Sequence, residues 1–200
     1  LLGRRKESVD LLEKSYRLDA HNPLTYMTLG SIYLTSNMYA KTKELLENAL
    51  DIPGNDNKTI AGITSLLSMA YFLSGDKGLA EKSAHAAINM DTEHDMDATA
   101  YHTLCCINLS KGDYEGVLRI AREGLSYHKG NPYLETELAK VLVNIAGDVD
   151  RAESLLEDAY AKLTYTNPDT VRWLAITKIE KGAYEQAKTL IPLLMEMAKT

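Results

Sequence analysis

The sequence predicts an all-α fold of helix pairs stacked in series. A leucine followed by a small residue recurs at intervals of 34 to 38 residues. A glycine or asparagine turn signal follows each of these leucines. After the turn comes a segment with a small residue and packing residues four and seven positions later. Residues at i, i+4 and i+7 lie on one face of a helix. Together the three signals predict one helix-turn-helix unit per interval.

The recurring leucine marks the first helix of each predicted unit. The first unit has the fullest pattern, in which Tyr26, the pair Leu29-Gly30 and Tyr33 lie along one segment. Asn22-Pro23 precedes this segment, and the same dipeptide opens two later units. Asn caps a helix N-terminus and Pro suits the first helical turn, so we expect a helix to begin at each of these sites. The marker leucines are Leu29, Leu67, Leu104, Leu138 and Leu174.

The second helix of each unit begins after a residue that tolerates a left-handed backbone, which is Asn37 in the first unit and glycine in the others. Small residues on this helix let two helix axes approach closely. Residues 1–20 show the same pattern and are predicted to be a second helix without its first. The five full sets are Thr42, Leu46 and Ala49; Ala80, Ala84 and Ala87; Val117, Ala121 and Gly124; Ala152, Leu156 and Ala159; and Ala187, Ile191 and Leu194.

These features resemble the tetratricopeptide repeat family, whose first helix carries W-x2-L-G-x2-Y in a unit of about 34 residues. The resemblance covers nearly the whole chain, although the later units keep fewer of the aromatic positions. It implies a right-handed α-solenoid of about eleven helices in one domain, residues 1–200. An unrelated helical bundle is the alternative. The predicted units are residues 1–20 (truncated), 22–54, 58–91, 95–129, 131–164 and 167–199.

Composition excludes several classes of function. The net charge is −6 and no concentrated basic patch is visible, which argues against nucleic-acid binding. No apolar run approaches the roughly 18 residues that a membrane-spanning helix needs, so we expect no direct membrane insertion. Cys105 and Cys106 are adjacent on a predicted helix and do not form a disulfide framework. We expect a soluble, cytoplasmic chain. Because it starts at Leu1 within a repeat, a removed leader and a periplasmic location remain the alternative.

The sequence shows no catalytic constellation, and we predict neither an enzyme nor a cofactor or metal site. The acidic stretch at residues 91–97 alternates like a calcium loop, but it has Met96 where glycine is needed and His102 where a glutamate is needed. His102 and Cys106 share a helix face, yet no third group is apparent to orient the histidine as a base. We therefore expect a packing or groove-lining role for this pair.

The family resemblance implies that the first helices of successive units line a concave groove. The predicted lining is mostly apolar and uncharged through the first three units and turns basic in the last two. Met, Phe and Leu on such a wall suit a hydrophobic peptide or an amphipathic helix. The alternative is that these side chains only pack between helices. The groove residues are Met27, Ser31, Leu34, Ser65, Met69, Phe72, His102, Cys106, Leu109, Lys140 and Arg172.

The predicted function is that of a protein–protein adaptor or assembly factor whose groove binds another protein. Assembly of a bacterial pilus or secretion system is one setting for such a role. The carboxylate clamp of heat-shock cochaperones is absent, because the corresponding early positions are not Lys, Asn or Arg. The alternative is a scaffold subunit that self-associates or docks through its apolar terminal helix. That terminal interface would comprise Leu190, Leu193, Leu194 and Met197.

Overall fold

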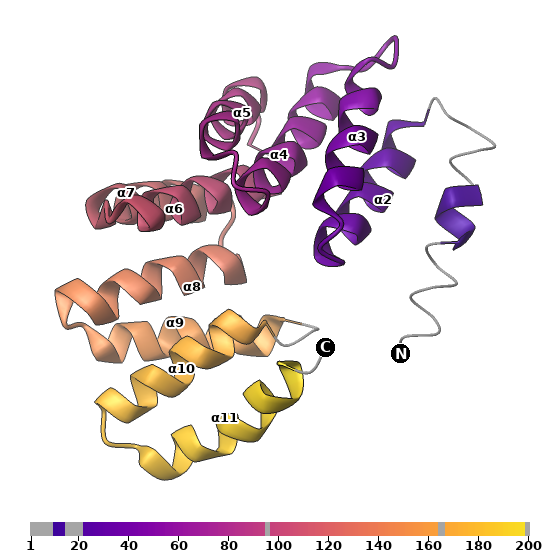
Figure 1. The fold of residues 1–200 in the computed structure, drawn as a ribbon. Coiled ribbons are helices and arrows are strands. Elements are labelled where there is room, and N and C mark those ends of the chain that lie inside the picture. The colour runs from indigo at the N-terminus through magenta and orange to yellow at the C-terminus, as the bar shows by residue number, and fades with distance from the viewer. Residues whose placement is uncertain (1–9, 15–21, 95–96, 164–166, 199–200) are drawn as a thin grey trace. The chain divides into compact units, whose positions relative to one another are not determined.

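The computed structural model describes residues 10–14, 22–94, 97–163 and 167–198, and within these ranges every regular element is helical (Figure 1). This confirms the predicted all-α fold of helix-turn-helix pairs. A short helical turn at residues 10–14 comes first, and the rest of residues 1–20 lies outside the described ranges. The elements that follow are α2 (Pro23–Thr35), α3 (Tyr39–Leu50), α4 (Asn57–Leu73), α5 (Lys77–Met90), α6 (Thr99–Lys111), α7 (Tyr114–Tyr127), α8 (Pro132–Val141), the π-helical turn η1 (Leu142–Ala146), α9 (Val149–Lys162), α10 (Pro168–Glu180) and α11 (Tyr184–Met197).

Packing divides the chain into two compact units, each larger than one repeat: the first unit is residues 1–103 and the second unit is residues 104–200. The division falls within α6. In the first unit α2 packs on α3, α3 on α4, and α4 on α5. In the second unit α7 packs on α8, α8 on α9, α9 on α10, and α10 on α11. Within each unit, therefore, consecutive helices pack in chain order. The prediction of one domain over residues 1–200 stays a prediction.

Asparagine caps begin three of the helices at the predicted dipeptides. The Asn22 side chain accepts a hydrogen bond from the Leu24 backbone N–H at 3.0 Å. Asn131 and Asn167 cap α8 and α10 in the same way, and proline follows each cap. The cap satisfies an otherwise unpaired N–H, and proline has none to lose at this position. The Asn-Pro prediction is therefore confirmed at all three sites.

The turns between paired helices also have the predicted left-handed backbone. Asn37 has φ 59° and Gly75 has φ 93°. The glycines of the remaining three turns also have positive φ. A residue that tolerates this conformation closes one helix and lets the chain reverse into the next.

Close helix packing in the first unit depends on the small residue that follows Leu29. A Cβ atom on Gly30 would lie 2.8 Å from Cδ2 of Leu46, so glycine at this position lets α2 and α3 approach. Leu29 and Leu46 are at most 1% exposed and belong to a core cluster shared by α2, α3 and α4. The other buried members of this cluster are Tyr26, Tyr33, Leu45, Ala49, Ile63, Leu66 and Leu67.

The second unit repeats this packing with one local departure. Ala152, Leu156 and Ala159 on α9 are fully buried, as the spacing of small residues predicts. Between α8 and α9 the helix widens into the π turn η1, which the sequence did not predict. There the side-chain amide of Asn144 donates to the backbone carbonyl of Lys140 at 2.7 Å. In the part of the chain that the structure describes, no helix has the length and apolarity to cross a bilayer.

Candidate protein-interaction surfaces

The first candidate surface lies on α2 and α4 within the first unit. The predicted residues of α2 are Met27, Ser31 and Leu34, which share one face of the helix, and all three are half-buried. Among the predicted residues of α4, Phe72 is also half-buried. We call these four residues the α2–α4 face. Helices α2 and α4 contact each other, so the structure brings two of the predicted lining segments together.

Two predicted groove residues of α4 are withdrawn from solvent. Ser65 is 3% exposed and Met69 is 8% exposed. Met69 lies one helical turn before Phe72 and Ser65 lies two turns before it. Both are on a stretch of α4 that is buried without interruption from Ser65 to Ala70. Their side chains therefore contribute to the packing of α4 more than to a surface that a partner could touch.

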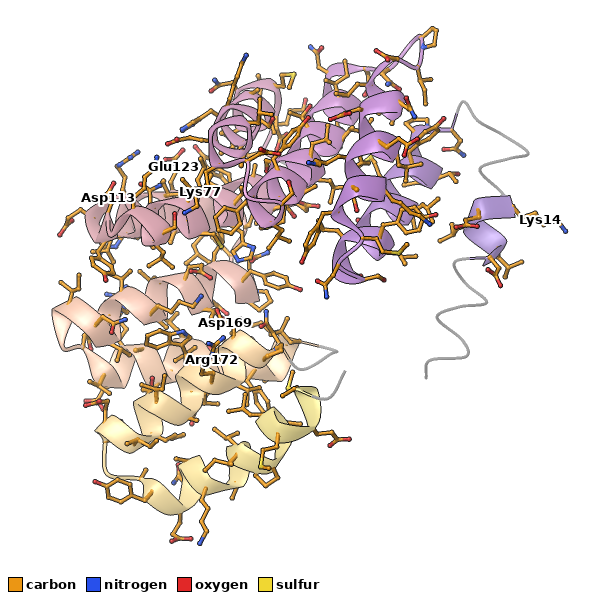
Figure 2. All side chains as sticks on the ribbon, viewed as in Figure 1. Lys14, Lys77, Asp113, Glu123, Asp169 and Arg172 are labelled. Atoms are coloured by element: carbon orange, nitrogen blue, oxygen red, sulfur yellow. The ribbon has the colours of Figure 1, made fainter. Side chains whose placement is uncertain are left out.

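The predicted basic end of the groove carries compensating acids. Lys140 on α8 is buried, and its Nζ lies 2.6 Å from Glu137 Oε1 and also pairs with Asp169. Arg172 is exposed on α10 and donates to the same Asp169 at 2.8 Å; both residues are labelled in Figure 2. Both cations are thus paired with acids within the second unit.

The ion pairs also set the protonation state of Lys140. Burial by itself would lower the pKa of this ammonium. The charge of Glu137 and hydrogen bonds to Asp169 and Glu137 outweigh that effect and raise the pKa above its ordinary value. Lys140 therefore stays charged at neutral pH, as a part of the helix packing.

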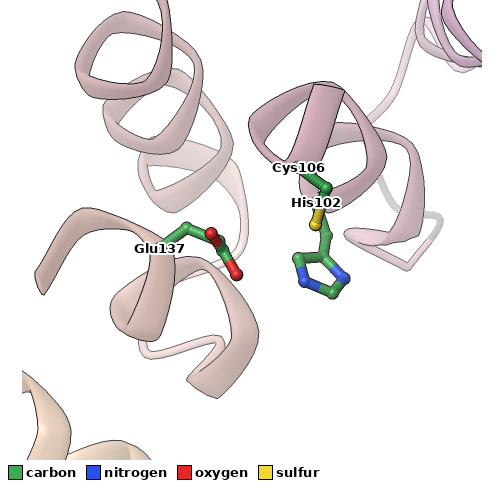
Figure 3. A group of neighbouring side chains, drawn as sticks. All are labelled: His102, Cys106 and Glu137. Atoms are coloured by element: carbon green, nitrogen blue, oxygen red, sulfur yellow. The ribbon is translucent and has the colours of Figure 1, made fainter. Parts of the chain in front are cut away.

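The sequence did not predict the position of Glu137, which lies beside the cysteine pair. In Figure 3 its carboxylate approaches Cys106 of α6, and the Cys106 sulfur lies within 4.8 Å of a carboxylate oxygen. His102, one turn earlier on α6, has a ring nitrogen within the same distance of that sulfur. Leu109 follows on α6 and is half-buried. The only local signal for Glu137 is its i, i+3 spacing to Lys140, which is typical of a helical ion pair.

Thiolate, imidazole and carboxylate are donor types that zinc accepts. Here, however, Glu137 already binds the Lys140 ammonium, and its side chain is 2% exposed. The neighbouring Cys105 is fully buried; burial, followed by the charge of Glu137, raises the pKa of its thiol. These contacts describe a charge-paired packing arrangement.

The second candidate surface is the terminal helix α11. Ile191 is 47% exposed and Met195 is 62% exposed. A hollow of about 500 Å³ lies between α10 and α11 and is lined by Leu174 and Leu190 among others. The four predicted interface residues, Leu190, Leu193, Leu194 and Met197, are all half-buried on this helix.

Comparison with known proteins supports the repeat architecture. A tetratricopeptide repeat model matches residues 24–56, which hold α2 and α3. No curated protein sequence matches the chain. Among solved structures, TTC0263, a thermophilic tetratricopeptide repeat protein of Thermus thermophilus, superposes with a TM-score of 0.68 at 16% identity. That match covers 89% of this chain and 92% of that one.

Two further solved structures have the same fold. PilW, a type IV pilus biogenesis factor, matches with a TM-score of 0.64 at 16% identity, over 96% of this chain and 85% of its own. YrrB, a tetratricopeptide repeat protein with an unusual peptide-binding site, matches with a TM-score of 0.51 at 12% identity, over 92% and 91%. The resemblance to the tetratricopeptide repeat family is confirmed, and the chain has the fold of these proteins.

Proposed function

We propose that this tetratricopeptide-fold chain is a protein–protein adaptor or assembly factor, and that the α2–α4 face binds a hydrophobic peptide or an amphipathic helix. The observation that carries the proposal is a contrast in exposure along two packed helices. Leu29 and Leu67 are at most 2% exposed, whereas Met27, Leu34 and Phe72 on the same helices keep part of their surface in solvent. Partly exposed Met, Leu and Phe side chains on neighbouring helices suit an apolar ligand.

The fold supports a binding role without naming the ligand. Fold alone does not determine function, so the partner has to be argued from the surface. YrrB is described as having a peptide-binding site, and PilW as a pilus biogenesis factor. Assembly of a bacterial pilus or secretion system is the more specific form of the proposal.

Phe72 is the most informative position for a test. A Phe72→Asp change puts a carboxylate on the α2–α4 face, where an apolar partner would have to bury it. Leu73 is 42% exposed on the next position of α4 and points about 100° away, so Leu73→Asp is a matched control. Met69→Glu is unsuitable because Met69 is buried and the change would disturb folding.

The experiment is affinity capture by the folded chain from its native cells, followed by calorimetric titration of each captured partner after purification. The proposal expects the Phe72→Asp variant to lose a partner that the Leu73→Asp variant keeps. Equal affinity of the unmodified chain and the Phe72→Asp variant for every purified partner would overturn it. Circular dichroism of both variants checks that the helices persist.

A second candidate function is that of a scaffold subunit that self-associates or docks through α11. The exposure of Ile191 and Met195 favours it. Sedimentation equilibrium of the isolated chain gives the test: a concentration-dependent dimer that Leu194→Glu disrupts would support self-association. A strictly monomeric chain at all concentrations would leave docking of another protein as the remaining form.

A further inference from the structure

Ser65 of α4 has a buried hydroxyl that does not bond to its own helix. Serine and threonine hydroxyls inside helices commonly donate to the backbone carbonyl four residues earlier. Thr136, which occupies the repeat position of Ser65 on α8, does so at 2.8 Å, and Thr103 on α6 does so at the same distance. Ser65 Oγ is withdrawn from solvent and has no hydrogen-bond partner among the residues that the structure describes. A buried polar group left unbonded lowers stability, so this hydroxyl needs a partner from outside the chain.

The same serine lines a small cavity between α4, α5 and the start of α6, wholly within the first unit. The cavity has a volume of about 10 Å³. Ala61, Ala87 and Ala100 form part of its wall and are at most 4% exposed, so the space exists because their side chains end at Cβ. Its volume is close to the roughly 10–15 Å³ that one water molecule needs. The cavity is therefore of the right size for a single water and too small for an organic ligand.

Two carboxylates complete the polar part of the cavity wall. Asp91 follows the last residue of α5, and Asp97 lies just before α6, where it accepts a hydrogen bond from the Thr99 backbone N–H at 2.8 Å. A carboxylate can only accept hydrogen bonds, whereas a hydroxyl and a water can each donate and accept. A buried water needs two to four polar partners, and Ser65 with the two carboxylates supplies that number.

We propose that this cavity is a hydration site, in which one ordered water molecule bridges the Ser65 hydroxyl to the carboxylates of Asp91 and Asp97. The water accepts from or donates to the serine and donates to the carboxylates, so it provides the hydrogen bond that α4 does not. It also links α4 to the end of α5 and to the start of α6. The inference goes beyond the proposed function and does not depend on the α2–α4 face.

Removing the Ser65 hydroxyl has opposite effects on stability with and without this water. If the water is bound, Ser65→Ala deletes a hydrogen bond and leaves the water short of a partner, so we expect the chain to unfold at a lower urea concentration. If the hydroxyl is unbonded, the same change removes an unsatisfied polar group and unfolding needs as much urea or more. Ser68→Ala is the matched control, because the Ser68 hydroxyl donates to the Ser65 carbonyl at 2.6 Å and to Thr103 Oγ1 at 3.0 Å. It should lower the urea midpoint in either case.

Oxygen-17 relaxation dispersion of the full chain counts its long-lived bound waters directly. The method follows the water oxygen, so exchanging hydroxyl protons do not contribute to the signal. Ser65→Val replaces the hydroxyl by apolar methyl groups and adds volume beside the cavity, and we expect it to hold one long-lived water fewer than the unmodified chain. Ser68→Ala should hold the same number as the unmodified chain. Circular dichroism checks that the helices persist, and the Ser65→Ala test stands by itself if Ser65→Val does not fold.

Three outcomes would overturn the inference. One is a Ser65→Ala variant as stable as the unmodified chain or more stable, and another is an unchanged number of long-lived waters in folded Ser65→Val. The third is a sodium ion as the occupant, shown by higher stability in sodium chloride than in choline chloride at equal ionic strength, with the difference lost in Ser65→Ala. Phe72→Asp should leave the number of bound waters unchanged, so failure here and failure of the α2–α4 proposal are distinguishable.

Discussion

Replacing Lys140 by methionine should destabilise the second unit through the acid that the lysine leaves behind. The ammonium bonds to Glu137 Oε1 at 2.6 Å and also pairs with Asp169. Methionine keeps most of the side-chain length but removes the charge. Glu137 then retains a carboxylate that is only 2% exposed, whereas Asp169, at 33% exposed, can regain water.

The magnitude follows from that difference in exposure. Removing one partner of a buried ion pair costs about 3–5 kcal/mol, because an uncompensated charge stays buried. Since only Glu137 is fully withdrawn from water, we expect a loss near the lower limit, about 3 kcal/mol. The double variant Glu137→Gln, Lys140→Met removes both charges. It should lower the free energy of unfolding by only about 1 kcal/mol, because the glutamine amide at position 137 retains hydrogen-bonding capacity.

The assay is urea unfolding of the full chain, followed by circular dichroism, for the unmodified chain, the single variant and the double variant. The reasoning requires the double variant to be more stable than the single one. It would be refuted if Lys140→Met unfolded at the same urea concentration as the unmodified chain, or if the second substitution restored no stability.

Three further predictions concern helix packing, acid sensitivity and thiol reactivity. Gly30→Ala should cost about 1–2 kcal/mol in urea unfolding because its Cβ meets α3 at 2.8 Å. At Gly78 on α5 an added Cβ would meet no atom within 4 Å, so Gly78→Ala should stabilise the chain by up to about 1 kcal/mol. Equal effects of the Gly30→Ala and Gly78→Ala substitutions on stability would contradict this prediction. Hydrogen bonds from two lysines at the end of α10 lower the pKa of Glu153. The contribution of Glu153 to folding stability is therefore complete above its ordinary pKa of 4.5, and it is lost as the pH falls through the lowered pKa. Glu153→Gln should flatten the acid side of the stability profile, and an unchanged profile would exclude this role. A thiol reagent should label half-buried Cys106 in the native chain and buried Cys105 only after unfolding. Mass spectrometry of digests measures the order of labelling, and labelling of Cys105 before Cys106 would contradict the prediction.

The repeat architecture was predictable because its signals are local. Asn22 and Pro23 act on the backbone within three residues, so the start of α2 follows from the dipeptide alone. Leu46 and Ala49 share a helix face by helix geometry, and their burial follows once that face has a neighbour. The recurrence of these signals extends the same conclusion to the later pairs.

The candidate surfaces were only partly predictable, because exposure depends on the helix that packs alongside. Ser31 and Met69 occupy the same predicted groove position, two residues after the marker leucine, yet Ser31 is half-buried and Met69 is 8% exposed. Lys140 was predicted as a basic groove residue, and its partners Glu137 and Asp169 lie on two different helices. Asp169 follows Lys140 by almost one repeat, so no local pattern connects the two.

The sequence by itself determined the helices, their caps and their pairing, since these depend on backbone geometry and on side chains a few residues apart. Only the tertiary structure decided which apolar side chains face solvent and which charges are compensated. Ile191 illustrates the difference: it occupies the same repeat position as Leu46, which is 0% exposed, yet Ile191 is 47% exposed. Burial is a property of neighbours in space, and the residue's own place in the repeat does not specify it.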